Sequence, residues 1–234
     1  YMHGMGVLAQ LTENVTIKDT SFMPNGVHRR TTASFADIMD FVNCKGVMKV
    51  NKVMVDGTRD DVINNHGIHF KIVKVEGNKV QCKFAHPQAY GFNCFFEGDE
   101  IEFIDSSSLL PIGSAKVKQS NKISPRITEI ELCNIADNSV IKVGGVIENA
   151  TWTSSLVVDN LETYNVPTRG ILVTTRKPVV IKNCVFHKCY MPSIHISDDA
   201  RSWYESGYCT DVLIENNVFD NCKDYAISIW PENT

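Results

Sequence analysis

One short pattern occurs twice in the sequence, as Val180-Ile181-Lys182-Asn183-Cys184-Val185-Phe186 and as Leu213-Ile214-Glu215-Asn216-Asn217-Val218-Phe219. Ile181 and Ile214 lie 33 positions apart, and the same offset relates Cys189 to Cys222 further along the chain. Both copies alternate apolar and polar residues around a central asparagine, which is typical of short strands that meet at a turn. The chain therefore contains an internal structural repeat, and the repeat decides the fold class.

A shorter offset shows how long one repeat is. Val158 and Ile181 lie 23 positions apart, so a basic coil of 23 residues is lengthened by ten residues where the sequence carries 198–205. The N-terminal part of the chain follows the same rule, because Val15 and Met48 are 33 positions apart. The segment 36–39 matches 60–63 at an offset of 24. Coils of this length cannot bury an apolar face alone and must stack on one another.

The repeat predicts an all-β protein, a right-handed parallel β-helix with an inserted antiparallel β-barrel or sandwich subdomain. A solenoid of α-helices is excluded, because no window keeps an apolar stripe with a period of 3.6 residues. Between residues 67 and 148 the period disappears, and paired strands such as 69–75 and 80–84 flank a Glu76-Gly77-Asn78 turn. We therefore expect N-terminal coils over 1–66, the insertion over 67–148 and C-terminal coils over 149–234, cut from a longer protein.

Composition excludes several classes of function. The 234 residues carry a net charge of −4 with dispersed lysines and arginines, which argues against a groove for nucleic acid. The longest apolar runs are only a few residues, so no membrane span is expected. Eight cysteines without a C-x-x-C pair favour buried thiols stacked along the coils over a zinc site. A disulfide between Cys189 and either Cys184 or Cys222 is the alternative in an oxidising compartment.

The repeat also predicts a column of acidic side chains. Equivalent positions on successive coils are about 4.8 Å apart, and alignment places His3-Gly4, Ala36-Asp37, Asp60-Asp61 and Arg169-Gly170 in one column. Carboxylates this close repel one another and raise the pKa of one member. The column is either a ladder of turn aspartates or the acid and base pair that glycoside hydrolysis requires.

Several motifs resemble the family 110 glycoside hydrolases, which are bacterial inverting α-galactosidases that remove terminal α-1,3-linked galactose. The motifs are 32–37 (TASFAD), 56–67 (DGTRDDVINNHG), 169–175 (RGILVTT), 198–207 (DDARSWYESG) and 98–103 (GDEIEF) in the insertion. The resemblance covers nearly the whole chain and implies a β-helix with β-barrel additions. It also implies terminal α-galactoside glycans as the partner, no cofactor, no metal, and a periplasmic or extracellular location.

The resemblance assigns the catalytic positions residue by residue. The three active-site aspartates of the family fall on Asp37, Asp60 and Asp61, with Asp60 implied as the general acid. Asp37 and Asp61 would hold and activate the water as base. Asn65 and Phe35 depart from the family pattern at positions that affect the shape of the pocket rather than the acids.

Seven further residues are expected to contact the substrate. Asn64 and His66 follow the aspartates on one strand, although a histidine in a turn is equally well explained structurally. His3 would lie one coil before Asp37, and Arg169 one coil after Asp61, where it would bind a hydroxyl or neutralise the carboxylates. The ten-residue bulge adds residues suited to stacking on a sugar face, or to bracing the coil: Arg201, Trp203 and Glu205.

Two other classes of function remain open from the sequence. A calcium-dependent polysaccharide lyase shares the β-helix and its acidic clusters, but it needs a basic residue beside the metal, and Arg169 is the one candidate in the column. A β-helix module that binds glycans without catalysis is the second alternative. The sequence leaves the oligomeric state undetermined.

Overall fold

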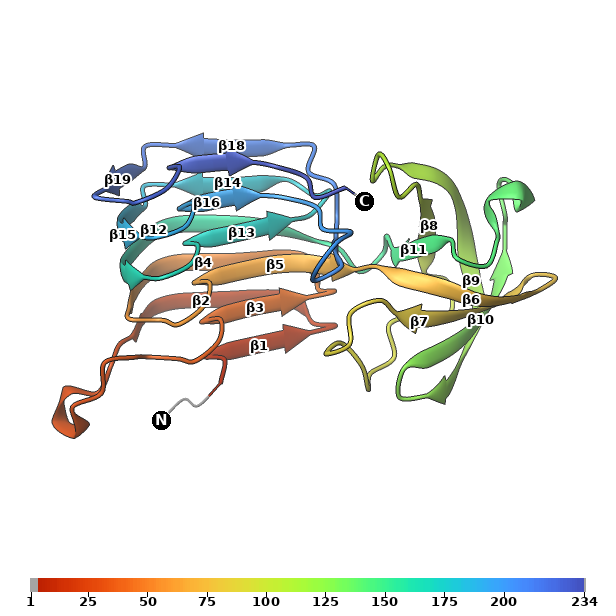
Figure 1. Cartoon of the computed structure of the whole chain (residues 1–234), viewed down its shortest axis with the longest axis horizontal. Coiled ribbons are helices and arrows are strands. Elements are labelled where there is room, and N and C mark those ends of the chain that lie inside the picture. Colours follow the sequence, from red (N-terminus) through yellow and green to blue (C-terminus); the bar gives the residue numbers. More distant parts are fainter. Residues whose placement is uncertain (1–3, 234) are drawn as a thin grey trace. The chain divides into compact units, whose positions relative to one another are not determined.

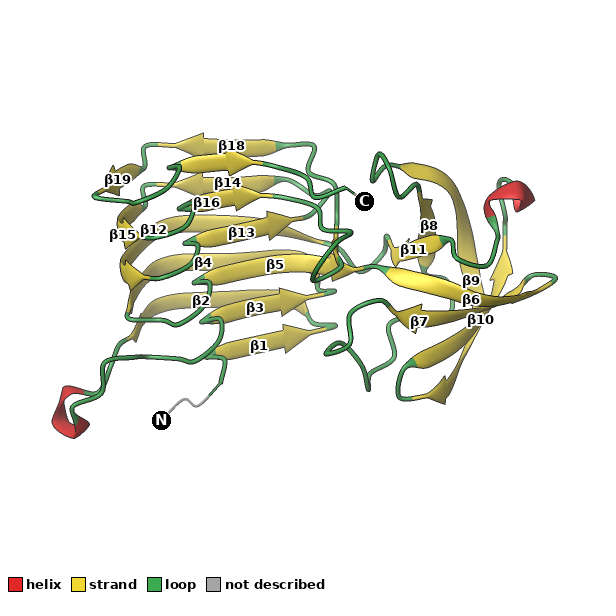
Figure 2. Cartoon of the chain, in the orientation of Figure 1, coloured by secondary structure: helices red, strands yellow, loops and turns green. Residues whose placement is uncertain are grey.

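The computed structural model describes residues 4–233, and it is all-β, as the sequence predicts. The chain divides into two compact units (Figure 1). The first unit comprises 1–66, 154–197 and 209–231. The second comprises 67–153, 198–208 and 232–234. The helices of the described residues are the short 3₁₀ segments η1 (Gly26–His28) and η2 (Asn138–Val140), so none has the length to cross a membrane (Figure 2).

The first unit is built from two parallel sheets whose strands alternate along the chain. The first sheet has the order β1 (Val7–Gln10), β3 (Met39–Val42), β5 (Ile63–Ile68), β13 (Ile171–Thr174), β16 (Ile194–Ile196) and β20 (Ile227–Ile229). The second sheet contains β2 (Glu13–Phe22), β4 (Lys45–Asp56), β12 (Ser154–Val166), β14 (Val179–Lys182), β15 (Val185–Cys189), β18 (Val212–Glu215) and β19 (Val218–Asp220). The chain passes from one sheet to the other and returns beside the strand it left, as Figure 1 shows.

The strand registers are those that the sequence offsets predict. Val158 pairs with Ile181, and Ile181 pairs with Ile214, at the offsets of 23 and 33. In the N-terminal part Met48 pairs with Val15, and Met39 pairs with Ile63. Register in a parallel pair is set by which apolar residues face the core, since a slip of one residue would turn each side chain to the opposite face.

Asparagines shape the turns of the second sheet. Asn160, Asn183 and Asn216 have φ angles of 57°, 54° and 54°, which place them in the left-handed region. Asparagine tolerates that region better than other residues with a side chain, because its short polar group bonds locally. Asn183 donates from Nδ2 to Asp159 Oδ1 at 2.8 Å. The recurrence of asparagine in the repeat therefore reflects a backbone requirement at each turn.

The two sheets enclose a continuous apolar core. Its largest buried side chains include Phe41 and Phe186, and Phe186 stacks on Phe219 of the next coil with ring centroids 5.3 Å apart. Cys44, Cys184 and Cys189 also lie in this core, where burial raises the pKa of each thiol to about 11. All eight cysteines are free in the part of the chain that the structure describes. The expectation of thiols stacked along the coils holds for the cysteines of the first unit and is wrong for Cys82, Cys94 and Cys133, which belong to the second unit.

Gly170 occupies a position in this core where no larger residue fits. A Cβ atom added there would lie 2.6 Å from the carbonyl oxygen of Ser193 and 2.7 Å from the ring of Phe186. We expect Gly170→Ala to lower the free energy of unfolding by about 1–3 kcal/mol through overpacking. Gly26→Ala is the matched control, since nothing lies within 4 Å of the added atom. Equal urea midpoints for both variants would contradict the packing described here.

The second unit contains a closed barrel of six strands, which confirms the antiparallel subdomain expected from the sequence. Its order is β10 (Ile127–Cys133), β7 (Lys79–Phe84), β6 (Phe70–Glu76), β11 (Val146–Asn149), β8 (Glu100–Ile104) and β9 (Pro111–Ser124). Phe70 packs against Phe84 and Phe95 with centroids 4.9 and 4.8 Å apart in the barrel interior. The barrel therefore has a core of its own, as an independently packed unit needs.

Residues 198–208, which the sequence placed in the C-terminal coils, pack with the barrel unit. The short strand β17 (Glu205–Ser206) pairs antiparallel with Ile68 and Gly67 at the end of β5. His69 and Asp198 are joined by a hydrogen bond of 3.0 Å. The lengthened coil thus departs from the first sheet after β16, because its backbone finds pairing partners in the second unit.

Candidate active site

Three aspartates converge where the chain enters two neighbouring strands of the first sheet. Asp37 precedes β3, and Asp60 and Asp61 precede β5. One carboxylate oxygen from each lies within 4.8 Å of the others. The backbone N–H of Asp61 donates to Asp37 Oδ1 at 3.1 Å and also to Asp60 Oδ1 at 3.1 Å. A single amide therefore joins all three residues, and the column expected from the repeat is present.

Hydroxyl side chains hold the turns that carry these aspartates. Ser34 Oγ donates to the carbonyl of Ala36 at 2.7 Å, and Thr58 Oγ1 donates to the carbonyl of Asp60 at 2.9 Å. Ser34 and Thr58 are both buried and lie within hydrogen-bonding distance of each other at 3.1 Å. Because both hydroxyls are at the same offset before an aspartate, the two turns are fixed in the same way and stack.

Arg169 supplies the positive charge of the cluster from the next coil. Its Nη1 lies 2.7 Å from Asp61 Oδ2, and its backbone N–H donates to Asp61 Oδ1 at 2.9 Å. The side chain of Asp61 is 3% exposed, whereas that of Arg169 is 24% exposed. A buried carboxylate with two such donors is held in one orientation. Arg169 thus neutralises the carboxylates, one of the two roles that the sequence suggested for it.

The surroundings of Asp60 favour the protonated form of its carboxyl. Partial burial and the negative charge of Asp61 raise the pKa of the Asp60 carboxyl above its usual value. The amide of Asp61 and the charge of Arg169 offset part of this rise. A carboxyl with a raised pKa retains its proton to higher pH than an ordinary aspartate, which is what a general acid requires.

The spacing of the three carboxyls differs from the expectation for an inverting enzyme. Inverting glycosidases hold their two carboxyl groups about 6.5–9.5 Å apart to admit a water molecule. Here the nearest oxygens lie within 4.8 Å, because adjacent strands bring the backbones together and the Asp61 amide bonds to both Asp37 and Asp60. The nearest oxygens of the three residues therefore lie closer together than the separation expected between the two carboxyl groups of an inverting enzyme.

Two buried residues beside the cluster were not identified from the sequence. Asp40 pairs in register with Asn64, and its Oδ1 lies 3.3 Å from His66 Nε2. His195 lies on β16, where burial and the charge of Arg169 lower its pKa. Its Nδ1 has no hydrogen-bond partner among the described residues. The offsets of 24 and 23 could have placed both on the outward face of this sheet, since they alternate with Met39 and Ile194, which face the core.

The remaining residues predicted to contact substrate are distributed over both units. Asn64 and His66 lie on β5, immediately after the aspartates, and Asn64 is buried. His3 lies outside the described residues. Arg201, Trp203 and Glu205 follow the C-terminal end of β16 and belong to the second unit. There Trp203 lies against His86 with centroids 4.6 Å apart, and its contact with a sugar remains a prediction.

Asp199 explains the conformation of the bulge without a bound ion. Its carboxylate accepts from the backbone N–H groups of Arg201, Ser202 and Trp203 at 2.7, 2.9 and 2.6 Å. Burial raises the pKa of Asp199, but the hydrogen bonds from Ser202 and these amides outweigh it and lower the pKa overall. In the first unit, Asp37, Asp60 and Asp61 lie close enough together to hold a metal ion, so the expectation that no metal takes part stays a prediction.

Comparison with known proteins shows which families the chain is similar to. Residues 79–147 match the sequence profile of the GLAA-B beta-barrel domain II. The chain is 40% identical over 235 residues to alpha-1,3-galactosidase A of Bacteroides thetaiotaomicron, covering 100% of this chain and 41% of that protein. It is 37% identical to alpha-1,3-galactosidase A of Akkermansia muciniphila, covering 99% and 39% of the two chains.

The chain is also similar to proteins named alpha-1,3-galactosidase B. The chain is 32% identical over 249 residues to alpha-1,3-galactosidase B of Parabacteroides distasonis, covering 99% of this chain and 41% of that protein. The chain thus spans about two fifths of the length of the curated relatives it matches. The resemblance to family 110 glycoside hydrolases is confirmed: along its whole length, this chain is a homologue of the alpha-1,3-galactosidases A and B.

Proposed function

We propose that the protein is a glycoside hydrolase, an inverting exo-α-galactosidase that removes terminal α-1,3-linked galactose from glycans. The observation that carries the proposal is the convergence of Asp37, Asp60 and Asp61, together with the raised pKa of the Asp60 carboxyl. One protonated and one ionised carboxyl on a common site is the requirement for acid and base catalysis of glycoside cleavage. The names of the relatives support the choice of galactose and of the linkage.

Each group has a separate role in this proposal. Asp60 protonates the oxygen of the leaving group, and Asp37 and Asp61 orient and deprotonate the attacking water. Arg169 holds the Asp61 carboxylate in place through the contact at 2.7 Å. Asn64 and His66 contact hydroxyls of the galactose. Inversion further requires that the Asp60 carboxyl swing away from Asp37 and Asp61 when substrate enters, since water needs a wider gap than oxygens within 4.8 Å of one another leave.

The first unit fits a segment of right-handed parallel β-helix. Its two parallel sheets, alternating strands and repeated asparagine turns support that assignment. We propose that 1–66 and 149–234 contribute the coils and that 67–148 is an insertion between them. A periplasmic or extracellular location in a bacterium is proposed on the same family resemblance, since that is where terminal α-galactosides of glycans are accessible.

Two substrates test the proposal against its rivals. The protein, expressed with any flanking sequence of its natural gene product, should release galactose from p-nitrophenyl α-galactoside and from an α-1,3-linked digalactoside. EDTA should leave both rates unchanged, because Arg169 already supplies the positive charge beside Asp61 and no metal takes part. Loss of activity with EDTA that calcium restores would favour the metal-dependent lyase. Binding of the digalactoside without release of galactose would favour a glycan-binding module.

A further inference from the structure

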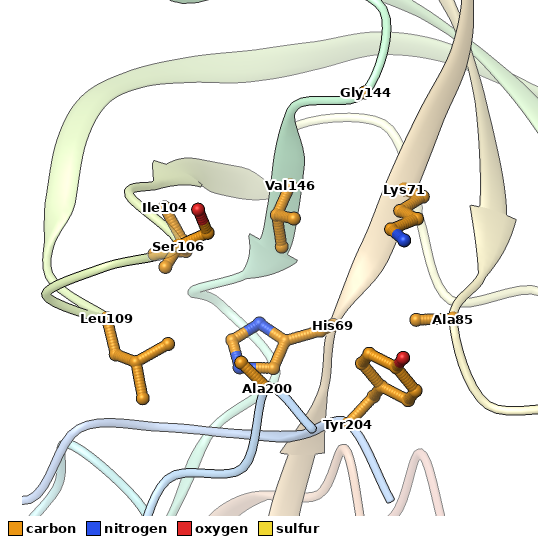
Figure 3. A pocket seen from close by; sticks show the side chains of 10 residues that line it. All are labelled: His69, Lys71, Ala85, Ile104, Ser106, Leu109, Gly144, Val146, Ala200 and Tyr204. Atoms are coloured by element: carbon orange, nitrogen blue, oxygen red, sulfur yellow. The ribbon is translucent and has the colours of Figure 1, made fainter. Parts of the chain in front are cut away.

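The second unit contains a pocket that the proposed hydrolysis does not use. Its volume is about 270 Å³. Figure 3 shows the side chains that line it. Barrel residues and the bulge line it together, and all of the lining residues belong to this one unit. The polar lining includes His69, Lys71 and Tyr204, and the apolar lining includes Leu109 and Val146. The pocket contains none of the aspartates of the candidate active site.

His69 presents a buried nitrogen to this pocket. The residue is 2% exposed, and its Nε2 lies 3.0 Å from Oδ1 of Asp198, which is 4% exposed. An ionised carboxylate can only accept, so the proton of the imidazole lies on Nε2. In the neutral imidazole Nδ1 then carries the lone pair, and this atom has no hydrogen-bond partner among the residues that the structure describes. A buried acceptor without a donor is costly, which indicates that a ligand or water completes it.

Lys71 adds hydrogen-bond donors to the pocket, whereas His69 offers an acceptor. Figure 3 shows its amino group directed toward the space that the His69 ring also borders. A lysine ammonium has three donors and no acceptor. A ligand that satisfies both residues must therefore donate to His69 and accept from Lys71. A hydroxyl group does both, whereas a carboxylate or phosphate cannot donate to the lone pair of His69.

The rest of the lining narrows the class of ligand. Leu109, Val146 and Ile104 form an apolar surface suited to the C–H faces of a small ring. The volume of about 270 Å³ lies just below the range of about 300–1,000 Å³ of pockets for drug-sized molecules. The occupant is thus a compact molecule with several hydroxyls and an apolar face.

We propose that this pocket is a second carbohydrate site, which binds one neutral monosaccharide unit through His69 and Lys71. The Asp198 carboxylate is a positioning group, because it fixes the proton of His69 on Nε2 and so leaves Nδ1 as the acceptor. The site is independent of glycoside hydrolysis, and it would bind sugar in a catalytically dead protein as well.

The test uses D-galactose, D-glucose and D-glucuronate as separate probes. Binding is followed in the Asp60→Asn protein by NMR, from the imidazole ¹⁵N resonances of His69 and the backbone amides of Ala200 and Val146. At least one neutral sugar should shift these signals in a saturable way and more tightly than glucuronate does. His69→Phe, which keeps an aromatic ring, and Lys71→Met should each weaken binding by about tenfold. Lys83→Met, an exposed lysine of the same barrel that is absent from the pocket lining, is the matched control and should leave binding unchanged.

Three results would overturn the proposal. The first is the absence of a saturable shift at Ala200 and Val146 with every probe. The second is tighter binding of glucuronate than of glucose, since it would show a protonated His69 and a pocket for acids. The third is unchanged affinity in Lys71→Met. This last variant alters an exposed side chain and should stay folded, so it decides the question if His69→Phe lowers the melting temperature too far to be measured.

Discussion

Replacing Asp60 by asparagine is expected to lower the rate of α-galactoside hydrolysis by about 10²–10⁴, the usual loss when a general acid is removed. Asparagine keeps an oxygen that can accept from the Asp61 amide, now 3.1 Å from Asp60 Oδ1, so the turn is retained. The initial rate on an α-1,3-linked digalactoside measures the effect. Asp211→Asn, a change at an exposed aspartate of the first unit, is the matched control and should retain the full rate.

The same variant should be at least as stable as the parent protein near neutral pH. The fold raises the pKa of Asp60, so the folded state binds that proton more tightly than the unfolded chain does. The parent protein therefore loses stability as the pH rises from the unfolded pKa through the folded one, and the loss persists at higher pH. Asparagine does not ionise, so the variant does not lose this stability as the pH rises. A lower melting temperature for Asp60→Asn than for the parent at pH 7 would assign Asp60 a structural role.

Replacing Arg169 by methionine is expected to lower the free energy of unfolding by about 3 kcal/mol. The change leaves the carboxylate of Asp61, which is 3% exposed, without the guanidinium now 2.7 Å away. Removing one partner of a buried ion pair leaves a charge without compensation, which is the costly case. Because Arg169 also lowers the pKa of Asp60, that pKa should rise further, and the pH optimum of hydrolysis should rise with it. Urea unfolding at pH 7 and a pH–rate profile measure the two effects.

A second substitution shows whether the stability lost in Arg169→Met comes from the unpaired charge or from lost packing. Asp61→Asn combined with Arg169→Met removes both charges, and the double variant should recover most of the lost stability. It should remain inactive, because Asp61 is proposed to activate the water. If the double variant were as unstable as Arg169→Met alone, the loss would come from the contacts of the arginine side chain rather than from an unpaired carboxylate.

The repeat made the pairing of the first unit predictable. Offsets of 23, 24 and 33 between apolar positions gave the registers observed for Val158, Ile181 and Ile63. Apolar side chains that stack in one core must recur at the coil length, so periodicity carries this information directly. The path of 198–208 was not predictable, because its pairing with Gly67 and Ile68 depends on contacts between segments far apart in the sequence.

In the candidate site, too, one part could be predicted from the sequence and another part could not. The column of Asp37, Asp61 and Arg169 followed from the alignment of coils, because backbone neighbours in a stack are fixed by register. The spacing of the carboxyls did not follow, since it depends on the side-chain bonds that the Asp61 amide makes to Asp37 and Asp60. Asp40 and His195 lacked a distinguishing motif and are recognised by burial.

The central claim is that these carboxyls hydrolyse a terminal α-galactoside by direct attack of water. Proton NMR of the digalactoside during the first turnovers tests it most directly, because it reports cleavage and the configuration of the released sugar together. The account predicts that β-galactose appears first and then converts slowly to the equilibrium mixture. Initial release of α-galactose would contradict the role of Asp37 and Asp61 as the base. It would indicate that the close spacing of 4.8 Å serves a covalent intermediate instead.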